Sequence, residues 1–546
     1  MKRSRVVAIA AVSLLSLALA ACSGSNSGTE KSNVAQDMTP YGKYKKPVTF
    51  TIGRGLYTGQ DLPKGQTIAN NTATQYVEDR VNVKAKVAWE AQDVEQKVSL
   101  SISTGKIPDV MIVNRNQFQQ LVDNDLIQDL GTAYKKTASK DLKAIMNSFD
   151  GRILSQMTID GKLMGLPSTA IGSQHDMLWI RKDWLEKVGG KVPTTQEEVV
   201  QLAQTFKEKD LAGGGKTVGL ISSPEVAGGG SSMNVLFYAN HAYPREWIKK
   251  DGKQAYGSIQ PETKTALAKI RDLYKAGTLD KQFPVRSDTE KQALISNGQT
   301  GIVFGPWWYP YSSFIDTFTN NRKSDWIAAS APTDSAGKLN VPDVDPVANI
   351  IVVRKGYAHP EAIIKSINVS NDFVHLNTKE DKAWAKSHNV PGRWSHLLVQ
   401  IPGQWDYNNA IERVYTALMK TIKDGGTDAN TLPEVVPYYQ SYEKLKKEGP
   451  EKVDPYSWSE VTARVTGEKA AIADNINPIA VTFFDKTPTM LTKWATLKKM
   501  EDEMYVKVVT GEEPLSAFDD FVTQWKKLGG DQITKEVNDA VAKKKG

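Results

Sequence analysis

The sequence predicts an α/β protein that is built from at least two domains. The chain has 546 residues, with 40% hydrophobic and 24% charged residues, which are values typical of globular proteins. This length exceeds what a single hydrophobic core supports. Strand-like and helix-like patterns alternate along the chain, and such alternation favours an α/β architecture.

The N-terminus has the features of a secretory signal. Lys2, Arg3 and Arg5 precede an apolar run that ends at Leu19, and this run is shorter than a membrane span. The segment before Cys22 reads Leu-Ala-Ala-Cys and resembles the lipobox of bacterial lipoproteins, in which the cysteine is acylated after cleavage. The alternative is an ordinary signal with a chance cysteine. Cys22 is the single cysteine of the chain, so it has no partner for an internal disulfide, and we expect it to be the anchor.

Two segments therefore precede the folded protein in this prediction. Residues 1–21 form the signal peptide, and residues 22–46, rich in Ser, Gly, Asn and Thr, form a flexible tether. Removal of the signal leaves 525 residues and lowers the formal charge from +7 to +4. That small excess, without a clustered basic stripe, gives no indication of nucleic-acid binding. The expected location is the extracytoplasmic face of the cell membrane, with contact through lipid only.

Strand and helix patterns follow one another from residue 48 to residue 188. Alternating or continuous apolar runs predict strands, and the Asp160-Gly161 pair predicts a hairpin turn. The expected strands are 48–52, 81–89, 109–113 and 177–181, with a hairpin over 159–167. The expected helices are 72–80, 94–103, 117–124 and 183–188.

Helices dominate the remainder of the chain. Thr195 is expected to cap a helix that has Glu197 and Glu198 in its first turn and runs to about Lys207. Amphipathic spacing predicts further helices over 260–276, 290–297, 360–368, 407–423, 438–448, 487–510 and 515–528.

Several ordered segments resemble the extracellular solute-binding proteins of ABC importers, family 1, and within them the large subgroup similar to alginate-oligosaccharide binders. The resemblance rests on the Gly-x-x-Pro-Asp segment 105–109, on 160–167, 178–185, 192–195, 301–308 and 350–362, and on the tail 488–531. It implies a periplasmic-binding-protein-like fold, in which two α/β lobes joined by hinge segments close on a ligand. The expected N-terminal lobe comprises residues 47–166 and 346–400, and the C-terminal lobe residues 167–345 and 401–546.

The sequence offers aromatic and polar side chains for a carbohydrate cleft, because sugars present apolar C–H faces and hydroxyl rims. The clearest group is Trp307, Trp308 and Tyr309, which directly follow an apolar strand. In the maltose-binding branch of the family, a tryptophan of the matching Gly-Pro-Trp segment stacks on sugar, and one of this pair is expected to be core. Further candidates are Asn114 and Asn116 after strand 109–113, then Arg393, Trp394, Trp405, Asp345, Asn349 and His175.

A calcium loop of the subgroup is expected to be lost in this chain. The matching segment begins at Asp210 and continues Leu-Ala-Gly-Gly-Gly-Lys216, so a single carboxylate remains. Calcium takes six or more oxygen ligands, several of them carboxylates. No metal and no cofactor are therefore expected.

The resemblance implies a monomeric, lipid-anchored, non-enzymatic component that captures an oligosaccharide and delivers it to the permease subunits of an ABC importer. The charge of the sugar stays open, because Arg54, Arg115, Arg181 and Arg393 suit acidic chains and neutral chains fit equally. One alternative is a lipoprotein that serves a membrane sensor or envelope assembly. Another is an exported glycoside hydrolase, which would need two opposed carboxylates that no recognisable motif supplies.

Overall fold

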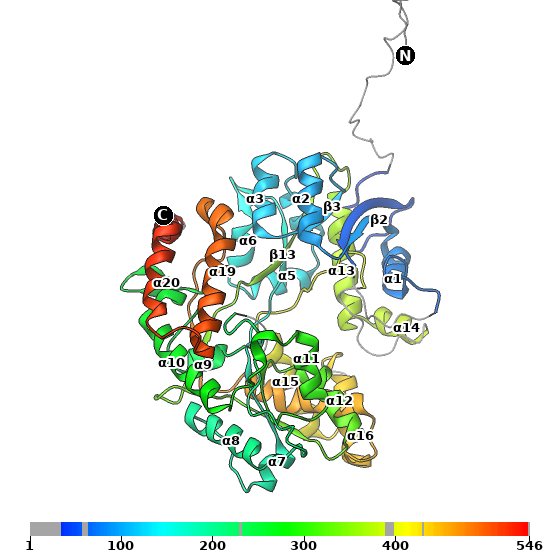
Figure 1. The fold of residues 1–546 in the computed structure, drawn as a ribbon. Coiled ribbons are helices and arrows are strands. Elements are labelled where there is room, and N and C mark those ends of the chain that lie inside the picture. Colours follow the sequence, from blue (N-terminus) through cyan, green and yellow to red (C-terminus); the bar gives the residue numbers. More distant parts are fainter. Residues whose placement is uncertain (1–33, 57–63, 229–231, 388–397, 429–430, 544–546) are drawn as a thin grey trace, which may run out of the picture.

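The computed structural model describes residues 34–56, 64–228, 232–387, 398–428 and 431–543. It has the predicted α/β architecture, with two sheet-containing lobes drawn one above the other in Figure 1. We call the lobe with the five-stranded sheet the first lobe and that with the three-stranded sheet the second lobe.

The sheet of the first lobe has the strand order β2-β1-β3-β13-β6. These strands are β1 (Val48–Gly55), β2 (Val83–Ala91), β3 (Val110–Val113), β6 (Leu166–Thr169) and β13 (Val347–Val353). Strands β1, β2 and β3 run parallel, whereas β13 is antiparallel to both β3 and β6. As a result, the carboxyl end of β3 and the amino end of β13 lie at the same edge of the sheet.

Helices cover this sheet, and their side chains complete its core. The helices are α1 (Thr72–Val81), α2 (Val94–Thr104), α3 (Arg115–Asp123), α4 (Gly131–Thr137), α5 (Lys140–Asn147), α6 (Arg152–Gln156), α13 (Pro360–His375) and α14 (Lys379–Ser387). A small hairpin of β4 (Thr158–Ile159) and β5 (Lys162–Leu163) turns at the predicted Asp160-Gly161 pair. The central helix α13 is buried along nearly its whole length, which explains why it extends past the predicted end at residue 368.

The second lobe is built on the sheet β10-β7-β11, in which the central β7 (Met177–Arg181) is antiparallel to both β10 (Ile302–Gly305) and β11 (Trp326–Ala329). A hairpin of β8 (Trp247–Lys250) and β9 (Lys253–Tyr256) lies apart from it. The helices are α7 (Lys182–Lys187), α8 (Gln196–Glu208), α9 (Asn234–Tyr238), α10 (Pro261–Ala276), α11 (Asp288–Ser296), α12 (Ser313–Asn320), α15 (Ala410–Asp424), α16 (Val435–Glu448), α17 (Pro455–Val461), α18 (Glu468–Ala471), α19 (Pro488–Thr510), α20 (Ala517–Trp525) and α21 (Asp531–Lys543).

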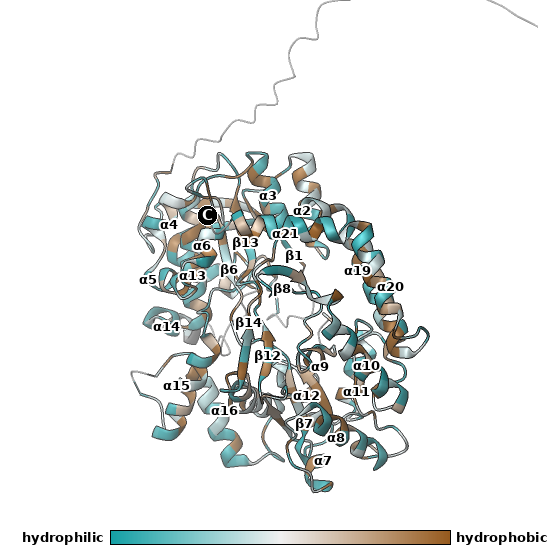
Figure 2. Ribbon diagram, turned by 90° about the vertical axis from the view of Figure 1, so that its left-hand side faces the viewer, coloured by the Kyte–Doolittle hydropathy of each residue, from teal (hydrophilic) through white to brown (hydrophobic). Residues whose placement is uncertain are grey.

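The chain passes between the lobes at several places, and two short strands pair there. Strand β12 (Leu339–Pro342) runs parallel to β14 (Ile476–Ile479), and Figure 2 shows this pair between the two lobes. Leu166 packs in the core of the first lobe, whereas Ile171 packs in the core of the second. Likewise, Trp405 packs in the core of the first lobe and Ala410 in that of the second. These memberships place one crossing between residues 166 and 171 and another between residues 405 and 410, whereas the expected domain bounds themselves stay a prediction.

The packed part of the chain begins before residue 46, the expected end of the tether. Tyr44 is 4% exposed, and its hydroxyl donates to Glu361 on α13 at 2.8 Å. The Tyr41 hydroxyl likewise donates to Asp372 at 2.6 Å. The signal peptide, Cys22 and the start of the tether lie outside the described residues. Within the described part of the chain, no helix has the length and apolar character that crossing a membrane requires.

Candidate functional site

Two loops of the second lobe meet at one edge of its sheet. Strands β7 and β10 pair with Gly305 opposite Met177. Because the strands are antiparallel, the segment entering β7 and the turn leaving β10 lie side by side. This register brings residues 172–176 next to the aromatic turn 306–309.

The aromatic turn separates a buried tryptophan from an accessible one. Trp307 is 7% exposed, and the guanidinium carbon of Arg464 lies 4.5 Å from its ring centre. Trp308 is 41% exposed, and its indole N–H donates to the Gln174 side chain at 3.2 Å. Tyr309 is buried beneath Gly305, and burial raises the pKa of its hydroxyl. Trp308 therefore presents an open ring of fixed orientation.

Trp308 lines the first of three hollows near the strand ends, which is also the largest of the three. It has a volume of about 600 Å³ and is lined by Ser223, Pro224, Glu225, Arg286, Ser287, Asp288, Lys291, Gln292, Trp308, Tyr309 and Ser312. Hydroxyl, amide and charged groups thus surround an aromatic ring. This mixture of an apolar face and polar rims matches the two faces of a sugar ring.

The second hollow lies where the chain passes between the lobes. Its volume is about 270 Å³, and its lining includes Gln174, His175 and Asp343 together with Arg152 of the first lobe. Burial lowers the pKa of His175 to about 4, and Nε2 of this ring has no hydrogen-bond partner. Burial raises the pKa of the adjacent Asp176 to about 6, and the charge of Lys291 offsets part of that increase.

The third hollow lies at the strand ends of the first lobe. It has a volume of about 210 Å³ and is lined by Val113, Asn114, Arg115, Asn116, Asp345, Val347, Ala348, Asn349, Ile350, Phe484 and Lys486. Four predicted residues, Asn114, Asn116, Asp345 and Asn349, therefore meet here. The Asn114 side chain also accepts the backbone N–H of Gln117 at 3.0 Å and caps α3, which fixes its orientation.

The three hollows follow one another from the first lobe to the second. Asp345 lines the third hollow, and the next residue, Pro346, lines the second. Gln174 lines the second hollow and accepts the hydrogen bond of Trp308, which lines the first. Neighbouring residues thus line successive hollows, and we call the three hollows together, with the aromatic platform at Trp308, the cleft.

The family profile described as "Bacterial extracellular solute-binding protein" matches residues 60–369, more than half of the chain. The chain belongs to this family.

Relatives of this solute-binding protein cover nearly its full length. The polygalacturonan/rhamnogalacturonan-binding protein YtcQ of Bacillus subtilis is 24% identical over 549 residues, which cover 98% of both chains. Among solved structures, the alginate-binding protein AlgQ2 without calcium has a TM-score of 0.61 at 16% identity, covering 93% of this chain and 100% of that chain. The substrate-binding protein FusA of S. pneumoniae with kestose has a TM-score of 0.58 at 16% identity, covering 91% and 99%. The structural likenesses confirm the predicted fold.

Other residues predicted for the site have different positions in the solute-binding protein. Trp405 is 3% exposed, and its indole N–H donates to the Pro167 carbonyl at 3.2 Å, so it packs in the core of the first lobe. Arg393 and Trp394 lie outside the described residues. The sequence reasoning missed Gln174 and Gln292, because no motif distinguishes a glutamine that lines a cleft from one on the surface.

Hydrogen bonds within the loop 210–217 hold the segment that corresponds to the calcium motif of the subgroup. The Asp210 carboxylate accepts the backbone N–H of Gly215 at 2.7 Å and the hydroxyl of Thr217 at 2.8 Å. Internal donors thus occupy the carboxylate that such a motif would offer to a cation. No group of three or more His, Cys, Asp or Glu side chains suited to a metal occurs among the described residues.

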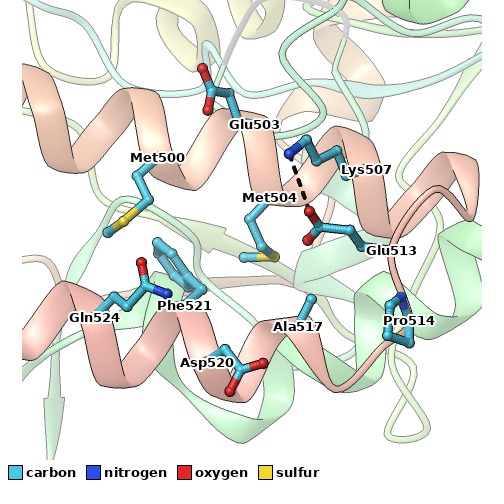
Figure 3. A pocket seen from close by; sticks show the side chains of 10 residues that line it. All are labelled: Met500, Glu503, Met504, Lys507, Glu513, Pro514, Ala517, Asp520, Phe521 and Gln524. Carbon is cyan, nitrogen blue, oxygen red and sulfur yellow. Dashed lines mark hydrogen bonds and ion pairs between the residues drawn. The ribbon is translucent and has the colours of Figure 1, made fainter.

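A further groove of about 440 Å³ lies between α19 and α20, away from both sets of strand ends. Figure 3 shows Met500 and Met504 facing Phe521 there, with the ion pair of Lys507 and Glu513 at one side. Residues of α19, of α20 and of the loop between them line this groove, and none of them lines the cleft.

Proposed function

We propose that this protein binds an oligosaccharide outside the cytoplasmic membrane and delivers it to the permease of an ABC importer. The observation that carries the proposal is Trp308, an accessible indole held by Gln174 within the cleft. A flat aromatic ring stacks on the C–H face of a sugar, and the neighbouring amides and hydroxyls bind its hydroxyl groups.

The relatives support this proposal. YtcQ is named for polygalacturonan and rhamnogalacturonan, and FusA was solved as an ABC-transporter substrate-binding protein with kestose. The three consecutive hollows provide room for more than one sugar unit, which favours an oligosaccharide. Capture without turnover is part of the proposal, as is a monomeric state.

Ligand binding is proposed to draw the two lobes together about the crossing segments. Closure is favoured only to the extent that the ligand makes better contacts in the closed state than in the open state. The closed form then docks on the permease. We also propose that an acyl chain on Cys22 holds the protein at the membrane and so raises its local concentration near the permease.

The binding proposal is tested by calorimetric titration of residues 34–546 with a panel of plant, algal and host-type oligosaccharides. We expect saturable binding of at least one oligosaccharide, with a rise in melting temperature. Chromatography of the same sugar after prolonged incubation should recover it unchanged. Absence of binding across the panel, or release of shorter products, would overturn the proposal.

The anchor is tested separately in the native host. Cys22→Ala should move the protein from the membrane fraction to the medium or periplasm, because no acyl chain can then be attached. Retention of the variant in the membrane fraction at the wild-type level would refute lipid anchoring at this residue.

A further inference from the structure

Three of the five Lys and Arg side chains that line the described hollows form ion pairs with carboxylates of the protein. Arg115 lines the third hollow, and its Nε and Nη2 each lie 2.6 Å from an oxygen of Asp345. Its Nη1 lies 3.4 Å from Asp485, and the side chain is 15% exposed. The two N–H donors that could bind the carboxylate of a ligand in a bidentate manner therefore already bind Asp345.

The same holds beside the aromatic platform. Nε of Arg286 lies 2.6 Å from Asp280, a residue that is itself buried. Nζ of Lys291 lies 2.9 Å from Asp288, and the lysine side chain is 4% exposed. Each of the two cations that line the hollow next to Trp308 therefore has a carboxylate partner within the protein.

Two further arginines that would suit an acidic sugar are buried within the lobes and do not line the three hollows. Arg181 forms a bidentate pair with Asp183 at 2.7 and 2.6 Å, and its guanidinium lies over the Trp184 ring. Arg54 is 1% exposed and directs Nη1 to the carbonyl of Ile68 at 3.4 Å. Arg181 is thus held within the second lobe and Arg54 within the first, and neither presents an exposed guanidinium to a ligand.

The cations that remain at the described part of the cleft are solvated. Arg152 and Lys486 are exposed, and ion pairs between such side chains and carboxylates are weak because water and salt screen them. Asp343 lines the same hollow as Arg152, and Lys486 follows Asp485 directly. A carboxylate on the ligand would have to leave water without gaining a strong ionic partner, and this loss is unfavourable.

We propose that the cleft selects uncharged oligosaccharides over chains of uronic acids. This inference rests on the proposed function and specifies its substrate class. Hydroxyl groups match the amides, hydroxyls and already paired charges that line the hollows. A uronate carboxylate instead meets cations whose charge Asp345, Asp280 and Asp288 have compensated.

The test compares a charged probe with its uncharged ester and with neutral oligosaccharides. Trigalacturonate and its trimethyl ester are titrated calorimetrically, beside neutral oligosaccharides of glucose, galactose and fructose. We expect the best neutral probe to bind at least tenfold more tightly than trigalacturonate. Equal or tighter binding of trigalacturonate overturns the inference and leaves oligosaccharide capture intact, whereas binding of no probe overturns the proposed function itself.

Variants test whether charge pairing is the cause. Asp345→Asn removes one partner of Arg115, so the affinity for trigalacturonate relative to the best neutral probe should rise at least tenfold. Asp485→Asn removes the second partner and should act in the same direction, by a few-fold. Asp125→Asn breaks the exposed pair with Lys355 elsewhere on the first lobe and should leave the ratio unchanged. An unchanged ratio in both test variants contradicts the inference.

Discussion

Replacing Gly467 by alanine tests how the aromatic turn is held. Gly467 has helical backbone angles, φ −67° and ψ −53°, at the end of the π-helical turn Thr462–Gly467. At an ordinary helical position, glycine to alanine stabilises by about 0.5–1 kcal/mol. Here the added Cβ would lie 2.5 Å from the carbonyl oxygen of Trp307 and 3.1 Å from the ring of Trp179.

The expected cost follows from these contacts. A carbon and a carbonyl oxygen need a separation of about 3.3 Å, so the turn or the helix must move by about 0.8 Å. The Trp179 indole N–H donates to the Pro306 carbonyl at 3.2 Å, which resists movement of the turn. Overpacking of this kind costs about 1–3 kcal/mol, which exceeds the gain in helix propensity. We expect a net loss of about 0.5–2 kcal/mol.

The assay is thermal unfolding, followed by titration with the best oligosaccharide. One kcal/mol corresponds to about 2–4 °C in melting temperature for a domain of this size. Affinity should fall as well, because Trp308 follows the displaced carbonyl directly. Gly426→Ala is the control, because its Cβ would meet no atom within 4 Å. A Gly467→Ala protein that melts at or above the wild-type temperature would refute the reasoning.

Further predictions concern the platform, the closed loop and a buried acid. Trp308→Ala should lower the affinity for the oligosaccharide at least tenfold, or about 1.4 kcal/mol, with little change in melting temperature. Trp307→Ala should instead lower the free energy of unfolding by about 3–5 kcal/mol, because Trp307 is buried. Adding a chelator should leave the melting temperature unchanged, and a drop would show that the protein binds a cation. Asp210→Ala should lower the melting temperature, because the backbone N–H of Gly215 then loses its acceptor. Because burial raises the pKa of Asp176 to about 6, its ionised form destabilises the native state above that pH, and stability recovers as the pH falls towards 4. Asp176→Asn should therefore be more stable than wild type at pH 7.5, with the advantage vanishing near pH 4; equal stability at both pH values would contradict the shift.

Local signals in the sequence were enough to predict many elements. Thr195 and Glu198 form the expected capping box of α8, and Asp160-Gly161 turns the expected hairpin. Helix α19 ends at Thr510 and α10 at Ala276, as their periodicity indicates. These features depend on neighbours a few residues apart, so one segment contains all the information.

Burial from distant segments limited the prediction elsewhere. Helix α13 continues past residue 368 with its side chains buried, and Asp372 there accepts a hydrogen bond from Tyr41, which lies 331 positions away in the sequence. The polar residues in the second half of α13 interrupt the amphipathic pattern, although they are buried and most of them form hydrogen bonds or ion pairs. No local window contains Tyr41, so periodicity alone ended this helix too early.

The sequence by itself determined the α/β class, the order of most elements and the aromatic and amide side chains that a sugar site needs. The tertiary structure alone decided that Trp308 is accessible while Trp307 and Trp405 are buried. It also brought Asn114 beside Asn349 and paired Arg115 with Asp345 across 230 positions. The physical reason for this difference is that residue type and spacing indicate only which side chains favour burial. Exposure and charge compensation depend instead on which strand ends meet when the chain crosses between the lobes.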